Sequence, residues 1–127
     1  MIRTDFSDSA AWKTIVAAAE SAEDPFMFNM QVVDDPAYDG ASAEVLMAAL
    51  PEDYPHSFLV IADKRAVTDP GHPLLVVDVL EERGREFRTL PSQVASIDSN
   101  LSIANMGFEE FAGMVDETGV FRGIPGM

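Results

Sequence analysis

The stretches Phe58-Leu59-Val60-Ile61-Ala62 and Leu74-Leu75-Val76-Val77-Asp78-Val79-Leu80 are the strongest strand signals in this chain. Each is an apolar run of strand length, interrupted only by Asp78, and such runs are typical of strands that are buried on both faces in the centre of a sheet. The ten residues Lys64–Pro73 in the connection contain the turn signal Asp69-Pro70-Gly71 and leave little room for a crossover helix. We therefore expect the two strands to be antiparallel neighbours, or else to be joined by an irregular excursion.

The N-terminal half predicts two further strands and two helices. Ile2–Phe6 has the length of a short strand, and Phe28–Val32 alternates apolar and polar residues as a half-buried strand does. Ser7 is a candidate cap for a helix whose apolar stripe begins at Trp12. A second, short helix follows the candidate cap Ser42, and its apolar residues are Val45, Leu46, Ala49 and Leu50.

The C-terminal half is hairpin-like. Glu81–Glu86 contains Gly84 and predicts a turn into a strand at Phe87–Leu90. The alternation at Asn100–Ala104 indicates another short strand, whereas the segment before it fits a single helical turn. Asn105 is a candidate cap for a final helix that carries Phe108, Phe111, Ala112 and Val115 on one side.

This order of elements predicts an α/β (α+β) fold in a single domain covering residues 1–127. The β-α-β-α-β rhythm of the N-terminal half favours parallel pairing with right-handed crossovers, and the second half adds a hairpin. We therefore expect a mixed sheet of five to six strands with about three helices packed on it.

The charge of the chain is strongly and unevenly negative. Its 127 residues include 22 Asp and Glu against 8 Lys and Arg, which gives a net charge of −14. Ten of the acidic residues lie between Thr14 and Asp63, where there is no Lys or Arg. Such a surface is repelled by nucleic-acid phosphates and by anionic membranes, so neither is an expected partner. It suits cations, a basic protein, or simply a high solubility.

Other classes of protein are excluded by composition. The chain has no cysteine, which excludes a disulfide scaffold, a thiol nucleophile and a Cys-based zinc site. No apolar run approaches the ~20 residues of a membrane span. The N-terminus lacks the basic-then-apolar order of a signal peptide, so we expect a cytoplasmic protein.

Carboxylates at the ends of predicted strands form the first candidate site. Asp5, Asp34, Asp35 and Asp63 each follow an apolar strand. If those strands are parallel, the four side chains converge on one edge of the sheet, where they suit Mg²⁺ or Ca²⁺. Aspartate is also favoured after strands because it forms turns and caps helices, and we favour this second interpretation.

Two further candidates are binding residues. Tyr38 and Asp39 lie in an acidic loop, where a tyrosine can anchor a basic partner. Arg122 can bind a carboxylate, but a surface ion pair is the ordinary explanation for such an arginine. His56 and His72 each stand beside a proline in a loop and lack the spacing of a zinc site. A Ser-His-Asp triad is assembled in space and has no fixed spacing, but we favour a loop role for both histidines. The glycines match no phosphate-binding motif.

Four stretches carry a resemblance to a known family. They are Arg3-Thr4-Asp5-Phe6-Ser7-Asp8 with Trp12, Val33-Asp34-Asp35-Pro36-Ala37-Tyr38, Asn100-Leu101-Ser102-Ile103-Ala104-Asn105-Met106, and Phe108-Glu109-Glu110-Phe111 with Gly119-Val120-Phe121-Arg122-Gly123. On these stretches the chain resembles a family of small acidic bacterial proteins, mostly from actinomycetes, that is known only as a domain of unknown function. The resemblance implies one intracellular domain and carries over no activity, cofactor or catalytic residue.

Two hypotheses about function follow. The first is a small acidic protein that binds a basic protein partner and needs no cofactor. The second is an enzyme or small-molecule-binding protein with an Asp-rich, cation-binding pocket at the strand ends.

Overall fold

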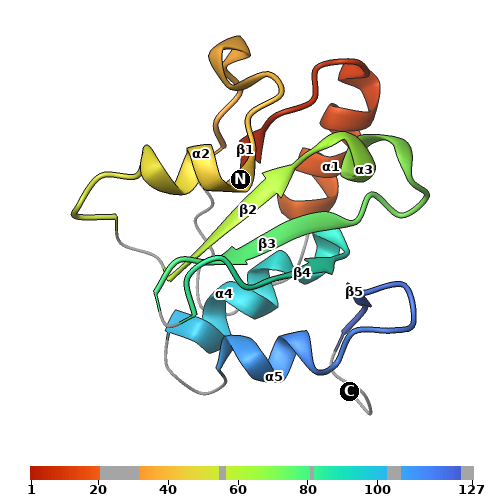
Figure 1. Ribbon diagram of the computed structural model, residues 1–127. Coiled ribbons are helices and arrows are strands. Elements are labelled where there is room, and N and C mark those ends of the chain that lie inside the picture. Colours follow the sequence, from red (N-terminus) through yellow and green to blue (C-terminus); the bar gives the residue numbers. More distant parts are fainter. Residues whose placement is uncertain (21–31, 55–56, 81, 103–106, 124–127) are drawn as a thin grey trace.

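A five-stranded mixed sheet forms the centre of the protein, as seen in a computed structural model that describes residues 1–20, 32–54, 57–80, 82–102 and 107–123 (Figure 1). Its strands lie side by side in chain order, β1 being parallel to β2 and β5 parallel to β4, whereas β3 is antiparallel to both of its neighbours. The strands are β1 (Ile2–Arg3), β2 (Phe58–Ala62), β3 (Leu74–Asp78), β4 (Glu86–Thr89) and β5 (Val120–Phe121).

The β2–β3 pair confirms the prediction made from the two apolar runs. The strands are antiparallel neighbours, with Phe58 opposite Asp78 and Ile61 opposite Leu75. Every residue of β2 is buried, because alternate side chains enter hydrophobic clusters on opposite faces of the sheet. The connection between the strands does hold a short helix, α3 (Lys64–Thr68), but this helix turns the chain back and does not carry it across the sheet.

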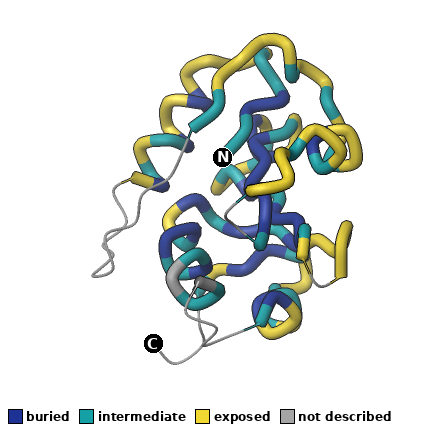
Figure 2. The backbone as a smooth tube through the Cα atoms, turned by 90° about the vertical axis from the view of Figure 1, so that its left-hand side faces the viewer, coloured by how far each residue is buried: buried dark blue, intermediate teal, exposed yellow. Residues whose placement is uncertain are grey.

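Five α-helices occur in the described residues, where the sequence predicted about three. They are α1 (Ser9–Glu20), α2 (Ala43–Ala48), α3, α4 (Val94–Ser102) and α5 (Phe108–Ala112), with 3₁₀ turns η1 (Pro36–Tyr38) and η2 (Pro91–Gln93). None of the helices in the described ranges is long and apolar enough to cross a membrane. Figure 2 shows the buried residues along the strands in the middle of the molecule, with exposed residues on the outer turns.

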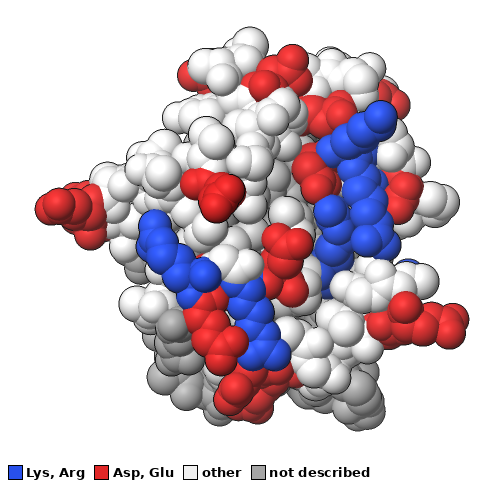
Figure 3. All heavy atoms as spheres, viewed as in Figure 1, with Lys and Arg blue, Asp and Glu red and all other residues white. Residues whose placement is uncertain are grey.

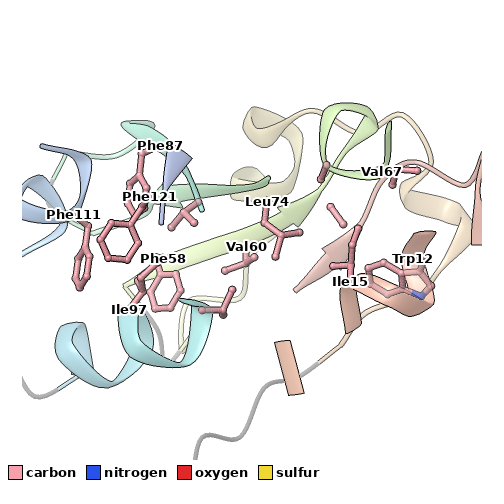
Figure 4. Packing of buried hydrophobic residues seen from close by; sticks show 14 of the residues in the cluster. Trp12, Ile15, Phe58, Val60, Val67, Leu74, Phe87, Ile97, Phe111 and Phe121 are labelled. Carbon is pink, nitrogen blue, oxygen red and sulfur yellow. The ribbon is translucent and has the colours of Figure 1, made fainter. Parts of the chain in front are cut away.

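The larger hydrophobic cluster lies on the sheet face that is covered by α1, α4 and α5 (Figure 4). Its phenylalanines interlock. The ring of Phe87 meets that of Phe108 edge-on at a centroid distance of 4.9 Å, and Phe111 meets Phe121 in the same way at 5.2 Å. The smaller cluster lies on the opposite face, where Leu46 of α2 covers Leu59, Ile61 and Val77.

Two local predictions were wrong and one strand was missed. Asn100 is part of α4, because Val94, Ile97 and Leu101 also fit a helical period and Asn100 donates to the carbonyl of Ser96, one turn earlier. The first helix is capped by Asp8, whose carboxylate accepts the Ala11 N–H at 3.0 Å, whereas Ser7 bonds to Asp5. Two residues cannot show an alternating pattern, so β5 had no signal in the sequence.

Two other predictions fall largely outside the described residues. Of the strand expected at Phe28–Val32, only Val32 is described, although Val33 forms a parallel bridge with Ile2. Asn105, the expected cap of the last helix, is also outside the described residues, and Gly107 precedes that helix.

Candidate functional site

The carboxyl ends of the parallel strands lie at one edge of the sheet, as predicted. Arg3 of β1 pairs with Ala62 of β2, so Asp5 and Asp63 follow strands that run in the same direction. Val33 bridges Ile2 in parallel, and Asp34 follows it directly. What the sequence did not show is that arginine side chains reach the same edge.

Arg3 is the first of these arginines, and it is 5% exposed. Its Nη1 lies 3.3 Å from Oδ1 of Asp34, its Nε donates to the carbonyl of Asp5, and its Nη2 donates to Oγ of Ser9 at the start of α1. The guanidinium carbon lies 4.4 Å from the centroid of the Phe6 ring, a cation–π contact. Arg3 therefore ties β1, the Asp34 segment and α1 together.

Arg88 is the second, and it binds Asp63 through both carboxylate oxygens at 2.8 and 2.7 Å. Oδ1 of Asp63 also accepts the Ala66 N–H at 3.1 Å, which caps α3. Burial by itself raises the pKa of Asp63, but the hydrogen bonds from Arg88 and Ala66 and the charge of Arg88 hold that pKa below its ordinary value. Asp63 is thus an ionised carboxylate with a fixed cationic partner.

The other two predicted metal ligands take part in turns. Oδ1 of Asp5 accepts the N–H of Ser7 at 2.9 Å, and Oδ1 of Asp35 accepts the N–H of Ala37 at 2.9 Å, which caps η1. Within the described ranges, no group of three or more acidic or histidine side chains is arranged to hold a metal ion. The structure therefore gives each of the four aspartates a partner of its own and does not gather them around one point.

Arg122 lies beside β5 and belongs to a turn. Its Nε is 2.6 Å from Oδ2 of Asp116, and Oδ1 of Asp116 accepts the N–H groups of Thr118 and Val120. Hydrogen bonds from Thr118 and Arg122 lower the pKa of Asp116 below its usual range. The local pairing that we considered for Arg122 is therefore present.

The acidic segment, which we define as Asp34–Asp53, is held on its inner side by several contacts. The Gly40 N–H donates to the carbonyl of Thr4, Ser42 caps α2 through the Val45 N–H, and Leu46 is 2% exposed. Just beyond the segment, the Tyr54 hydroxyl donates to the carbonyl of Phe58 at 2.7 Å, and burial raises the pKa of Tyr54 to about 12. The segment is therefore a packed part of the fold.

The outer side of the acidic segment is rich in unpaired negative charge. Six acidic residues are exposed there, and among the described residues only Asp34 forms an ion pair. Tyr38 is half-buried against the smaller cluster, so Asp39 is the more accessible of those two predicted binding residues. The other exposed acidic residues are Asp35, Glu44, Glu52 and Asp53.

The arginines, by contrast, are engaged within the protein. Five of them form ion pairs with an aspartate or glutamate, and Arg83 donates to the carbonyls of Val79 and Met47. In Figure 3, Lys and Arg gather over α3 and the nearby end of β4 and over the β3–β4 turn, with acidic side chains beside both groups. Acidic side chains over the loop after α2 stand apart from both groups, at the left-hand edge.

Two adjacent apolar residues of α2 differ in exposure. The sequence predicted both as apolar residues of this helix, and in the structure Leu46 is buried whereas Val45 is 57% exposed. Neighbouring helix positions are about 100° apart, so only the packing of α2 on the sheet decides which of them faces inward. We define the outer face of α2 as Glu44, Val45, Ala48 and the C-cap residue Ala49, all of which are exposed.

A family model described as Domain of unknown function (DUF6924) matches residues 1–124. The chain belongs to this family. The match confirms the resemblance to a family of unknown function, and DUF6924 brings with it no activity, cofactor or site residue. No curated protein matches the chain. The chemistry of this DUF6924 member must therefore be argued from its own residues.

Proposed function

We propose that this member of DUF6924 is a cytoplasmic binding protein that engages a basic protein partner through the acidic segment. The observation that carries the proposal is the unpaired charge of Asp35, Asp39, Glu44, Glu52 and Asp53, which are exposed and form no ion pair with a described residue. A basic partner would supply the cations that this segment lacks.

Two properties of the acidic segment favour this role, its charge and its fixed backbone. Complementary charge steers partners together and raises the association rate. The inner contacts of the acidic segment also fix its backbone before any partner arrives, which lowers the entropic cost of binding. The partner is a protein and not a nucleic acid, because phosphates would be repelled by the same charges.

The test uses two triple variants with the same change in net charge. The segment variant carries Glu44→Gln, Glu52→Gln and Asp53→Asn, and the control variant carries Glu20→Gln, Glu109→Gln and Glu117→Gln at exposed positions outside the segment. The probe is a fluorescent Lys/Ala peptide, whose association rate is measured by stopped flow at several salt concentrations.

We expect the wild-type association rate to fall as salt rises, since the Debye length shrinks from ~10 Å at 0.1 M to ~3 Å at 1 M. At low salt the segment variant should associate roughly tenfold more slowly than the wild type, and the control variant much less so. Equal losses in the two variants would show that only net charge matters, and would overturn the proposal.

A further inference from the structure

The outer face of α2 combines an exposed apolar side chain with unpaired acidic residues. Val45 is one of two large hydrophobic residues that are exposed in the described chain, the other being Leu80 at 70%. Glu44 precedes Val45, the exposed Ala48 and the C-cap residue Ala49 follow it, and Glu52 and Asp53 lie in the loop after the helix. Val45, Ala48 and Ala49 therefore form a small apolar strip that is bordered by acidic residues.

The backbone beneath this face is held at both ends. Oγ of Ser42 accepts the Val45 N–H at 3.3 Å at the start of α2, and Nη2 of Arg83 donates to the Met47 carbonyl at 3.1 Å near its end. Leu46 anchors the inner side of the helix in the smaller cluster. The position of Val45 is therefore set before binding, which is what an interface anchor requires.

We propose that the outer face of α2 is a docking surface for a basic amphipathic helix of a partner protein, one apolar side chain of which packs on Val45, Ala48 and Ala49. The inference rests on the proposed function and specifies the partner. Charge complementarity selects lysine and arginine on the flanks of that helix, opposite Glu44, Glu52 and Asp53. The two small alanines let a second helix approach closely.

Leu80 offers a matched control within the same chain. It is more exposed than Val45, but it lies in the β3–β4 turn, where Arg85 pairs with Glu82 and Arg83 is also present. A ligand that seeks any exposed hydrophobic residue would use both sites. A ligand that requires both an apolar strip and unpaired acidic residues would bind at Val45 and not at Leu80.

The experiment compares two fluorescent peptides of about 18 residues, or about five helical turns. Both contain Lys, Leu and Ala in the same proportions. In the first, the leucines recur at i, i+3, i+4 and i+7 and form a stripe, and in the second their order is scrambled. Binding to the wild type, Val45→Ser and Leu80→Ser is measured by fluorescence anisotropy, and circular dichroism confirms that both variants are folded.

We expect the wild type to bind the striped peptide more tightly than the scrambled one. Val45→Ser should weaken binding of the striped peptide by roughly three- to tenfold, as loss of one partly buried aliphatic contact does. Leu80→Ser should leave its affinity within about twofold of the wild-type value, since surface changes away from an interface have small effects.

Three results would overturn the inference, and they separate it from the proposed function. If both peptides bind equally and Val45→Ser has no effect, the apolar contact is absent but charge-driven binding stands. If Val45→Ser and Leu80→Ser weaken binding equally, the contact is unspecific adhesion. If neither peptide binds, the proposed function fails together with the inference.

Discussion

The two faces of the sheet differ in what they bury and in what they display. On one face, α1, α4 and α5 enclose a large cluster that includes Trp12, Ile15 and the interlocked phenylalanines. On the other, α2 covers a smaller cluster through Leu46, while its outer side is exposed and acidic. From the larger buried cluster we expect stability to be concentrated on the aromatic face, while the α2 face carries unpaired charge.

Truncating one buried residue on each face tests how stability is divided between the two faces. Phe111→Ala removes a fully buried ring from the aromatic cluster and should lower the free energy of unfolding by about 3–5 kcal/mol. Leu46→Ala should cost about 2–3 kcal/mol, because the α2 cluster is smaller and can partly collapse. Urea denaturation followed by circular dichroism measures both. A larger loss for Leu46→Ala would reverse the assignment of stability to the aromatic face.

The next test concerns the Arg88–Asp63 pair, which secures the carboxyl end of β2. Asp63→Asn keeps an oxygen for the Ala66 N–H but removes the charge that faces Arg88, so we expect a loss of about 1–3 kcal/mol at pH 7. The folded pKa of Asp63 lies below its unfolded value, so the charge stabilises the fold above about pH 4 and this contribution is lost as the pH falls through the folded pKa.

Thermal unfolding between pH 3 and pH 7 checks the sign of this effect. The difference in Tm between wild type and Asp63→Asn should be largest at neutral pH and should shrink toward acid. A difference that is constant over this range would mean that the charge of Asp63 contributes nothing to stability.

A smaller effect is expected where the acidic segment is held in place. Ser42→Ala removes the cap of α2 and should lower the free energy of unfolding by about 1 kcal/mol. If a fixed α2 matters for docking, the same variant should also bind the striped peptide less tightly. If the Ser42→Ala protein is destabilised but binds the striped peptide as tightly as the wild type does, a fixed α2 is not required for docking.

The smallest effect is predicted for divalent cations. Arg3 and Arg88 already supply positive charge at the edge where Asp5, Asp34 and Asp63 follow parallel strands. Millimolar Mg²⁺ or Ca²⁺ should therefore shift the Tm by less than about 1 °C, whereas a ligand at 100 times its Kd would stabilise the fold by about 2.7 kcal/mol. A clear rise in Tm that Asp34→Asn with Asp35→Asn abolishes would restore the metal-site hypothesis.

Much of the fold was predictable because its signals are local. The unbroken apolar runs indicated a central pair of antiparallel strands, and Ser42 indicated the start of α2. The failures are of two kinds. Asn100 and its neighbours satisfy both a strand and a helix period, and β5 is too short to have a period at all.

The candidate site was predictable in its charge but not in its arrangement. The excess of acidic residues between Thr14 and Asp63, and the position of aspartates after parallel strands, are properties of residue order and could be read directly. That Val45 faces outward while Leu46 is buried depends on how α2 is rotated against the sheet, and a six-residue helix has too few turns to show this in its pattern.

Residue order alone is enough to predict the buried strands, the acidic surface and the absence of cysteine chemistry, because each depends on composition or on neighbours within one turn or strand. Which charges are neutralised depends instead on how the sheet is assembled. Arg88 meets Asp63 across 25 residues and Arg3 meets Asp34 across 31, contacts that exist because β4, β3 and β2 lie side by side and Val33 bridges β1. Residue order carries no local signal for pairs so far apart, so which acidic residues are left unpaired emerges only when the sheet is assembled.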